Sequence, residues 1–134
     1  MPQSFRLASM DVVAFVPISN VNAAKEFYGG TLGLKLLHEE LPFALVFDAN
    51  GILLRLAITP EHKPARGTVL GWRVPDIEAA VKGLAQAGIR FERYEFLQQN
   101  EAGIWTTPTG ARVAWFQDPE GNLLSISEHP ELAQ

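Results

Sequence analysis

Hydrophobic and polar residues alternate with a period of two along many short stretches of the chain, and recur at helical spacing along two others. The alternating stretches are rich in Val, Ile, Leu and Phe, and predict strands at 10–18, 34–40, 43–48, 52–58, 68–74, 90–96, 104–107, 111–116 and 122–127. The helical spacing predicts two helices, which begin after residues 20 and 76. The pattern therefore predicts an α+β domain built mostly of strands.

Both predicted helices carry local start and stop signals. Asn20 and Asp76 stand just before the first helical positions, and their side-chain oxygens can accept hydrogen bonds from free backbone N–H groups there. Gly33 and Gly88 follow the last apolar positions, where a left-handed residue often ends a helix.

The two helix starts belong to an internal repeat. Segment 20–24 (NVNAA) matches segment 76–80 (DIEAA) at an offset of 56 residues, and segment 48–54 matches segment 118–124 at an offset of 70. The second copy is thus 14 residues longer, and the extra residues fall in 98–110. Each copy reads as βαβββ. One such unit leaves a sheet face bare, so we expect the two units to share a core.

Composition limits the kinds of partner and the cellular location that we expect for this protein. The net charge of −4 and the isoelectric point near 5.3 argue against a nucleic-acid surface. The absence of cysteine excludes thiolate chemistry and disulfides. No apolar run approaches the ~20 residues that cross a bilayer, and the N-terminus has no long apolar core like that of a signal peptide. We expect a cytoplasmic protein with no nucleic-acid or membrane partner.

Two motifs carry a family resemblance. Phe27-Tyr28 is followed by Leu32-Gly33-Leu34 after the first helix, and a DPEGN turn at 118–122 precedes the last strand. With the repeat, these resemble the vicinal-oxygen-chelate superfamily, which includes glyoxalase I, extradiol dioxygenases and bleomycin- and fosfomycin-resistance proteins. The resemblance implies one domain over 1–134, with two tandem βαβββ modules (10–59 and 68–128, linker 60–67) that form a U-shaped mixed sheet around a cleft. It also implies a homodimer.

The resemblance further implies four metal-ligand positions, and this chain fills them with Val13, Arg55, Val69 and Ser125. Metal-dependent relatives usually place His, Gln or Glu there. Valine has no lone pair, arginine is a permanent cation, and a lone serine is a poor ligand for a transition ion. His38, His62 and His129 share no spacing that would build another metal site, and no Ser-His-Asp order stands out. We therefore expect neither a metal nor another cofactor.

Strand alternation, together with the resemblance, predicts what lines the cleft instead. The expected ligand-binding residues are Val13, Phe15, Arg55, Val69, Arg73, Trp115 and Ser125. Two roles stay open for Arg55: contact with an anionic ligand, or an ion pair with Glu39, Glu40, Glu92, Glu95 or Glu101. Two also stay open for Trp115, which could pair with Trp105 across a hairpin or stack on a flat ligand.

Two functions follow from this cleft. The first is a glyoxalase/bleomycin-resistance-like protein that binds a small organic molecule, anionic or neutral, without the family metal. The alternative is an enzyme related to the family's glyoxalases, lyases, isomerases or dioxygenases. It would act through a degenerate metal site, or through Arg55 with a carboxylate such as Glu101. The segment 98–103 could form a lid or simply a longer loop.

Overall fold

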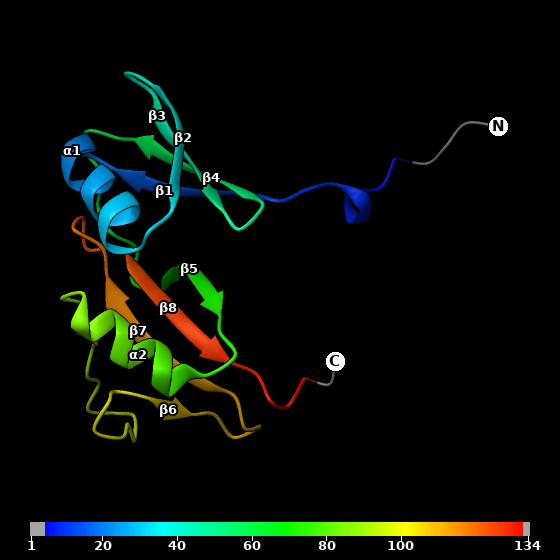
Figure 1. The fold of residues 1–134 in the computed structure, drawn as a ribbon, viewed down its shortest axis with the longest axis vertical. Coiled ribbons are helices and arrows are strands. Elements are labelled where there is room, and N and C mark those ends of the chain that lie inside the picture. Colours follow the sequence, from blue (N-terminus) through cyan, green and yellow to red (C-terminus); the bar gives the residue numbers. More distant parts are fainter. Residues whose placement is uncertain (1–4, 133–134) are drawn as a thin grey trace.

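The computed structural model describes residues 5–132 and contains two four-stranded sheets (Figure 1). The first sheet has the order β1 (Val13–Ile18), β4 (Ile52–Ile58), β3 (Ala44–Ala49) and β2 (Lys35–Glu40). The second has the order β5 (Thr68–Arg73), β8 (Leu123–Glu128), β7 (Arg112–Gln117) and β6 (Trp105–Thr106). The pairs β1–β4 and β5–β8 are parallel, and all other strand pairs are antiparallel. The predicted α+β fold of tandem βαβββ modules is confirmed.

The predicted caps begin both helices. The Asn20 side chain accepts a hydrogen bond from the backbone of Ala23 at 2.9 Å and starts α1 (Val21–Ala24). The Asp76 side chain accepts one from the backbone of Ala79 at 3.2 Å and starts α2 (Ile77–Gln86). After α1 the chain widens into a π-helical segment, Lys25–Thr31. An N-terminal segment with a short 3₁₀ turn (Leu7–Ser9) projects away from the body (Figure 1).

The two modules share one hydrophobic core. Each strand places alternate side chains beneath the helices, and buried residues of both sheets belong to the same cluster. Phe27, from the first module, lies 6.5 Å from Phe116, from the second, between ring centroids. Neither module would bury its apolar face alone, so we treat the modules as one folding unit.

A buried polar cluster joins the modules at the DPEGN turn. The Tyr28 hydroxyl donates to Oδ2 of Asp118 at 2.7 Å, and Nδ2 of Asn122 donates to the same oxygen at 2.9 Å. Asn122 also donates to the carbonyl of Pro17, in β1, at 2.8 Å. Burial, and then the negative charge of Asp118, raise the pKa of Tyr28, so its hydroxyl keeps its proton. Tyr28 and Asn122 are fully buried, and the cluster fixes the turn to the first module.

The neighbouring Glu120 caps α1 from the other module. Its carboxylate accepts hydrogen bonds from the Ser19 hydroxyl and from the backbone N–H of Asn20, both at 2.7 Å. Partial burial opposes the charged form, but the hydrogen bonds outweigh it and hold the pKa of Glu120 below its usual range. A carboxylate at a helix N-terminus also interacts favourably with the helix dipole.

The predicted strand at 90–96 is wrong. Only Phe91 pairs there, as an isolated bridge to Phe116, with one further hydrogen bond from the Glu92 backbone to Trp115. The reason is that β7 offers a single free edge of limited length. The segment around Phe91 occupies one end of that edge, and the two-residue β6 occupies the other. Across residues 5–132, no helix is long and apolar enough to span a membrane.

Candidate functional site

Side chains of β7 and β8 alternate between the core and the opposite face of the second sheet. Ala114, Phe116, Leu124 and Ile126 are 0–3% exposed and belong to the core. The residues between them point the other way. We call this side the open face of the second sheet. It carries Gly71, Arg73, Trp105, Val113, Trp115, Ser125 and Ser127.

An aromatic cluster covers part of the open face. Trp105 and Trp115 stack with ring centroids 6.1 Å apart and planes 29° apart, and Tyr94 meets Trp115 edge-on at 5.5 Å. The indole N–H of Trp115 donates to the Thr68 hydroxyl at 3.1 Å, which fixes the ring across the sheet. The predicted cross-strand pair is therefore confirmed. Stacking of Trp115 on a ligand stays a prediction, and the half-buried cluster offers the apolar surface that it needs.

Arg73 ends β5 on the same face. It lies directly beside Ser127 of β8 in the parallel register. Its side chain is exposed, and within the described part of the chain no carboxylate forms an ion pair with it. Arg73 thus makes no direct ion pair, although its charge acts on the nearby Glu131 carboxylate, and its guanidinium can meet an anionic group that approaches the open face.

Arg55, by contrast, has an internal partner. Its guanidinium donates to Oε1 of Glu40 at 2.6 Å, and His38 contacts the other oxygen of Glu40 at 2.7 Å. The hydrogen bond from Arg55, and then that from His38, lower the pKa of Glu40 to about 2. Of the two roles left open for Arg55, the ion pair is present. The proposed partner Glu101 lies elsewhere, and its backbone carbonyl accepts a hydrogen bond from Arg93.

The remaining predicted site residues lie on both sheets. Val13 and Phe15 are 42% and 61% exposed on the first sheet, away from its core-facing side chains. Ser125 lies between Gly71 and Trp115 on the open face of the second sheet. Val69 stands in a bulge between Thr68 and Leu70 and packs against the core. The bulge interrupts the alternation that predicted Val69 on the same face as Arg73.

The loop at 98–103 is held by its own hydrogen bonds. Oδ1 of Asn100 accepts from the backbones of Ala102 and Ile104, both at 2.9 Å, and the Gln99 side chain bridges to Glu92, Tyr94 and Gly103. It is an ordered turn beside β6.

Sequence reasoning missed a histidine arrangement at the end of β8. Nε2 of His129 lies 2.8 Å from the Ser127 hydroxyl, and Nδ1 of His129 lies 3.0 Å from a carboxylate oxygen of Glu131. This arrangement uses Glu131 in place of an aspartate, and it was not predicted. Ser127 belongs to β8, whereas Glu131 lies in the turn that follows, so no periodicity of the sequence predicts that these side chains meet.

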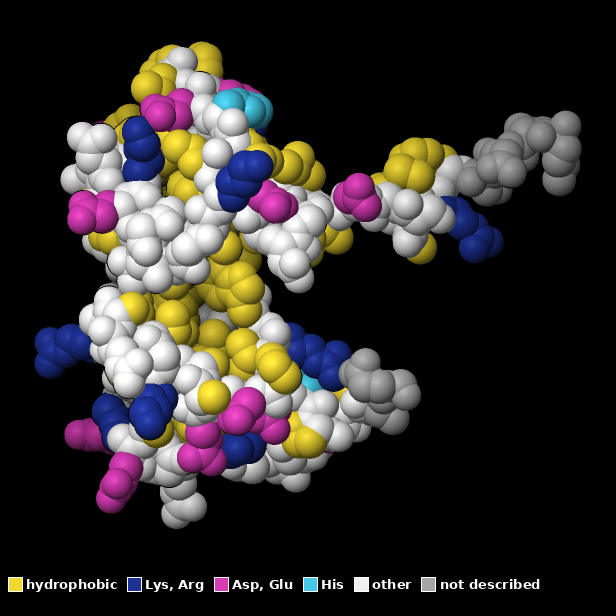
Figure 2. Space-filling view, viewed as in Figure 1, with side chains coloured by type: hydrophobic (Ala, Val, Ile, Leu, Met, Phe, Trp, Pro, Cys, Tyr) yellow, Lys and Arg dark blue, Asp and Glu magenta, His cyan; other side chains and the backbone are white. Residues whose placement is uncertain are grey.

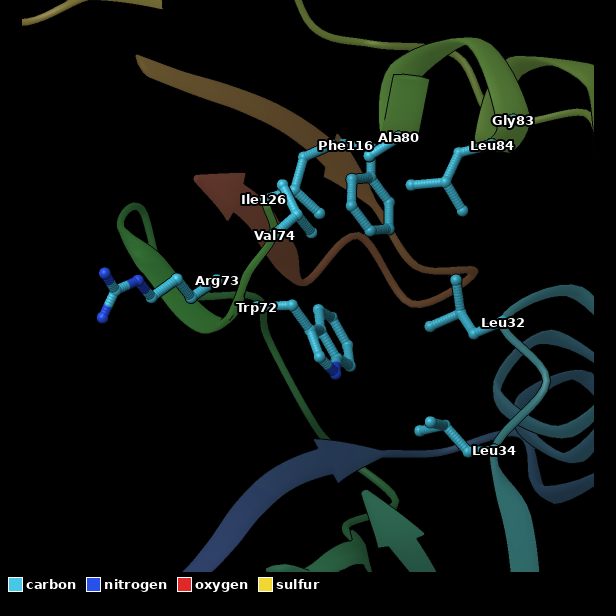
Figure 3. Close-up of a pocket in the computed structure, with 10 residues that line it drawn as sticks. All are labelled: Leu32, Leu34, Trp72, Arg73, Val74, Ala80, Gly83, Leu84, Phe116 and Ile126. Carbon is cyan, nitrogen blue, oxygen red and sulfur yellow. The ribbon is translucent and has the colours of Figure 1, made fainter. Parts of the chain in front are cut away.

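The structure also contains a hollow of about 390 Å³ on the helix-bearing side, between the modules (Figure 3). Figure 2 shows it as a band of hydrophobic side chains between the two lobes. Its apolar lining includes Leu34, Trp72 and Leu84. Arg73 borders it, but its side chain points away from the others (Figure 3). This hollow and the open face lie on opposite sides of the second sheet.

A sequence model of the Glyoxalase/Bleomycin resistance protein/Dioxygenase superfamily matches residues 9–126. The chain belongs to this superfamily. No curated protein matches its sequence.

Solved structures of the superfamily share the fold. The glyoxalase family protein from Enterococcus faecalis is 23% identical, with a TM-score of 0.70 over 90% of this chain and 99% of that one. The lactoylglutathione lyase from Agrobacterium tumefaciens is 18% identical, with a TM-score of 0.67 over 90% and 93%. A superfamily protein from Alicyclobacillus acidocaldarius is 22% identical, with a TM-score of 0.66 over 92% and 94%. At these identities the likeness concerns the fold alone.

The metal that the superfamily implies does not fit the residues at its four positions. Val13 and Val69 offer no donor atom, Arg55 is held by Glu40, and Ser125 is a single hydroxyl. Nor does any group of three His, Asp or Glu side chains in residues 5–132 come together as a metal site.

Proposed function

We propose that this superfamily member binds a small aromatic carboxylate, or a similar flat anion, on the open face of the second sheet without the family metal. The observation that carries the proposal is the Trp105–Trp115 stack on the same face as Arg73, a cation with no ion-pair partner in the described residues. Aromatic surface orients a flat ring, and a guanidinium suits a carboxylate.

The spacing of the strands supports this pairing of features. Ser127, beside Arg73, lies opposite Val113, and Val113 lies opposite Trp105. Neighbouring strands are ~4.8 Å apart, so Arg73 and Trp105 begin about 14 Å apart at their backbones. Arginine and tryptophan side chains are long enough to reach a two-ring acid placed between these strands.

The first sheet carries an exposed apolar patch that suits contact with a second copy of the chain. Phe15 is 61% exposed, and the adjacent Val13 and Leu53 are 42% and 45% exposed on the first sheet. A patch of this kind suits a partner surface, which supports the expected homodimer. We place the protein in the cytoplasm.

The test uses 2-naphthoate and its neutral amide as probes, with binding followed by calorimetry. We expect 2-naphthoate to bind more tightly than the amide. Arg73→Met should weaken 2-naphthoate about fivefold, since an exposed charge pair contributes up to about 1 kcal/mol. The same change should leave the amide unaffected.

Arg55→Met serves as the matched comparison, because it removes the other arginine considered for the anion. Binding unchanged in Arg55→Met and weakened in Arg73→Met supports the proposal. Binding weakened in Arg55→Met and unchanged in Arg73→Met would show that Arg55, and not Arg73, contacts the ligand. Failure of both probes to bind the wild-type protein would contradict the proposal altogether.

A further inference from the structure

A hydrogen-bonded chain of three side chains ends β8 on the open face. Ser127 Oγ, His129 Nε2 and Nδ1, and Glu131 Oε2 are joined by distances of 2.8 and 3.0 Å. The side chains of His129 and Glu131 are 27% and 23% exposed, and both residues lie at the surface beyond the end of β8. A nucleophile, a base and a carboxylate that orients the base are the parts of an acyl-transfer site.

The carboxylate selects the useful form of the histidine. The hydrogen bond from His129, with a smaller contribution from Arg73, holds the pKa of Glu131 below its usual range, so Glu131 is an anion and can only accept. A neutral His129 must therefore carry its hydrogen on Nδ1. That leaves the lone pair of Nε2 for the proton of the Ser127 hydroxyl, which is the arrangement that a general base requires.

Arg73 supplies the positive charge that an oxyanion would need. It is the register neighbour of Ser127 in the parallel strands, which places the two backbones ~4.8 Å apart. A guanidinium beside the nucleophile can stabilise negative charge that develops on a carbonyl oxygen. A hollow of about 610 Å³ adjoins these residues and is bordered by Arg73, Glu128 and His129, although Ser127 does not line it.

We propose that Ser127, His129 and Glu131 hydrolyse small esters of phenols, with Arg73 facing the carbonyl oxygen. Ser127 Oγ attacks the ester carbon as its proton passes to His129 Nε2, and the bond to the phenol oxygen breaks as that oxygen takes the proton. Water then attacks the acyl-serine, giving its proton to His129. The carboxylic acid leaves, and the proton returns to Ser127. One ester and one water become one acid and one phenol.

The choice of phenol esters follows from the surroundings. Trp105 lies two strands from Ser127, so an aromatic ring on the Trp105–Trp115 stack can place its ester group near the hydroxyl. A single cation is a modest stabiliser of the oxyanion, so the leaving group must be a good one. The inference rests on the binding function proposed above only for where the ring lies.

The test is hydrolysis of p-nitrophenyl acetate by the full chain, with Ser127→Ala and His129→Ala. We expect turnover above the buffer rate, and losses of about 10²–10⁴-fold when the base is removed. The loss should be similar when the nucleophile is removed, because the two act as a unit. After acid quenching, mass spectrometry should locate the acetyl group on Ser127.

Ser19→Ala is the control, because that hydroxyl donates to a carboxylate, Glu120, and is not bonded to a histidine. It should keep full activity. Glu131→Gln tests the positioning role: kcat should fall about tenfold or more with KM unchanged, whereas a merely structural contact would change only the melting temperature.

Three results would overturn the inference: Ser127→Ala hydrolysing as fast as the wild type, acetyl groups found only on other residues, or no turnover above buffer. Melting curves identify any variant that fails to fold. If Ser127→Ala does not fold, Ser127→Cys, which keeps a nucleophile in place, is tested instead and should carry the acetyl group at position 127. Binding of 2-naphthoate without hydrolysis would refute this inference alone. Acylation of Ser127 without 2-naphthoate binding would refute only the binding proposal.

Discussion

The Tyr28–Asp118 hydrogen bond should contribute measurably to stability, because it joins the two modules inside the core. Tyr28→Phe removes one oxygen and leaves the ring in place. Asp118 keeps its hydrogen bonds from Asn122 and from the backbone of Glu120, so the carboxylate is not stranded. The loss is one buried hydrogen bond to a charged acceptor, which is worth about 1.5–3 kcal/mol. For a chain of 134 residues this corresponds to a fall in Tm of about 5–10 °C.

Differential scanning calorimetry of Tyr28→Phe measures this loss, and the chain supplies a matched control. Its other tyrosine, Tyr94, is half-buried, and within residues 5–132 its hydroxyl makes no hydrogen bond. Tyr94→Phe should therefore melt within about 1–2 °C of the wild type, as expected for changes away from such contacts. Equal melting of Tyr28→Phe and Tyr94→Phe would refute the reasoning. Two separate transitions in the wild type would refute the view that the modules fold as one.

Three further outcomes are expected. Arg55→Met should change the Tm only slightly near pH 7, because the Arg55 and Glu40 side chains are 33% and 38% exposed. The folded pKa of Glu40 is lowered, so the contribution of this pair is present above the ordinary value of 4.5. Thus the difference between the wild type and Arg55→Met should disappear as the pH falls from 4.5 toward about 2. Chelation of metals should leave the Tm unchanged, and elemental analysis that finds about one Zn, Ni, Mn or Fe per chain would contradict this. Light scattering should give about twice the chain mass of 14.8 kDa, and a monomer at micromolar concentration would contradict the homodimer.

Local patterns predicted the elements that depend on local physics. Strand alternation, the caps Asn20 and Asp76 and the turn at Asp118 all follow from residues a few positions apart. The predicted strand at 90–96 does not form, because strand pairing depends on a free edge that is distant in the sequence. The free edge of β7 was already shared with β6.

The site was harder to predict because small irregularities change which side chains meet. A bulge between Leu36 and His38 shifts the register of β2. It therefore places Glu40, in preference to Glu39, on the same side of the sheet as Arg55. A second bulge moves Val69 toward the core. The Ser127–His129–Glu131 chain depends on the path of the tail beyond β8, which no periodicity specifies.

The most direct test of the account is where a ligand binds, and the three tryptophans report on it. Trp105 and Trp115 lie on the open face, whereas Trp72 lines the hollow on the opposite, helix-bearing side. Two-dimensional ¹H–¹⁵N NMR resolves the three indole N–H signals, which Trp→Phe variants assign. Titration with 2-naphthoate should shift the signals of Trp105 and Trp115 and leave that of Trp72 in place. A shift of Trp72 alone would place the ligand in the hollow and contradict the account.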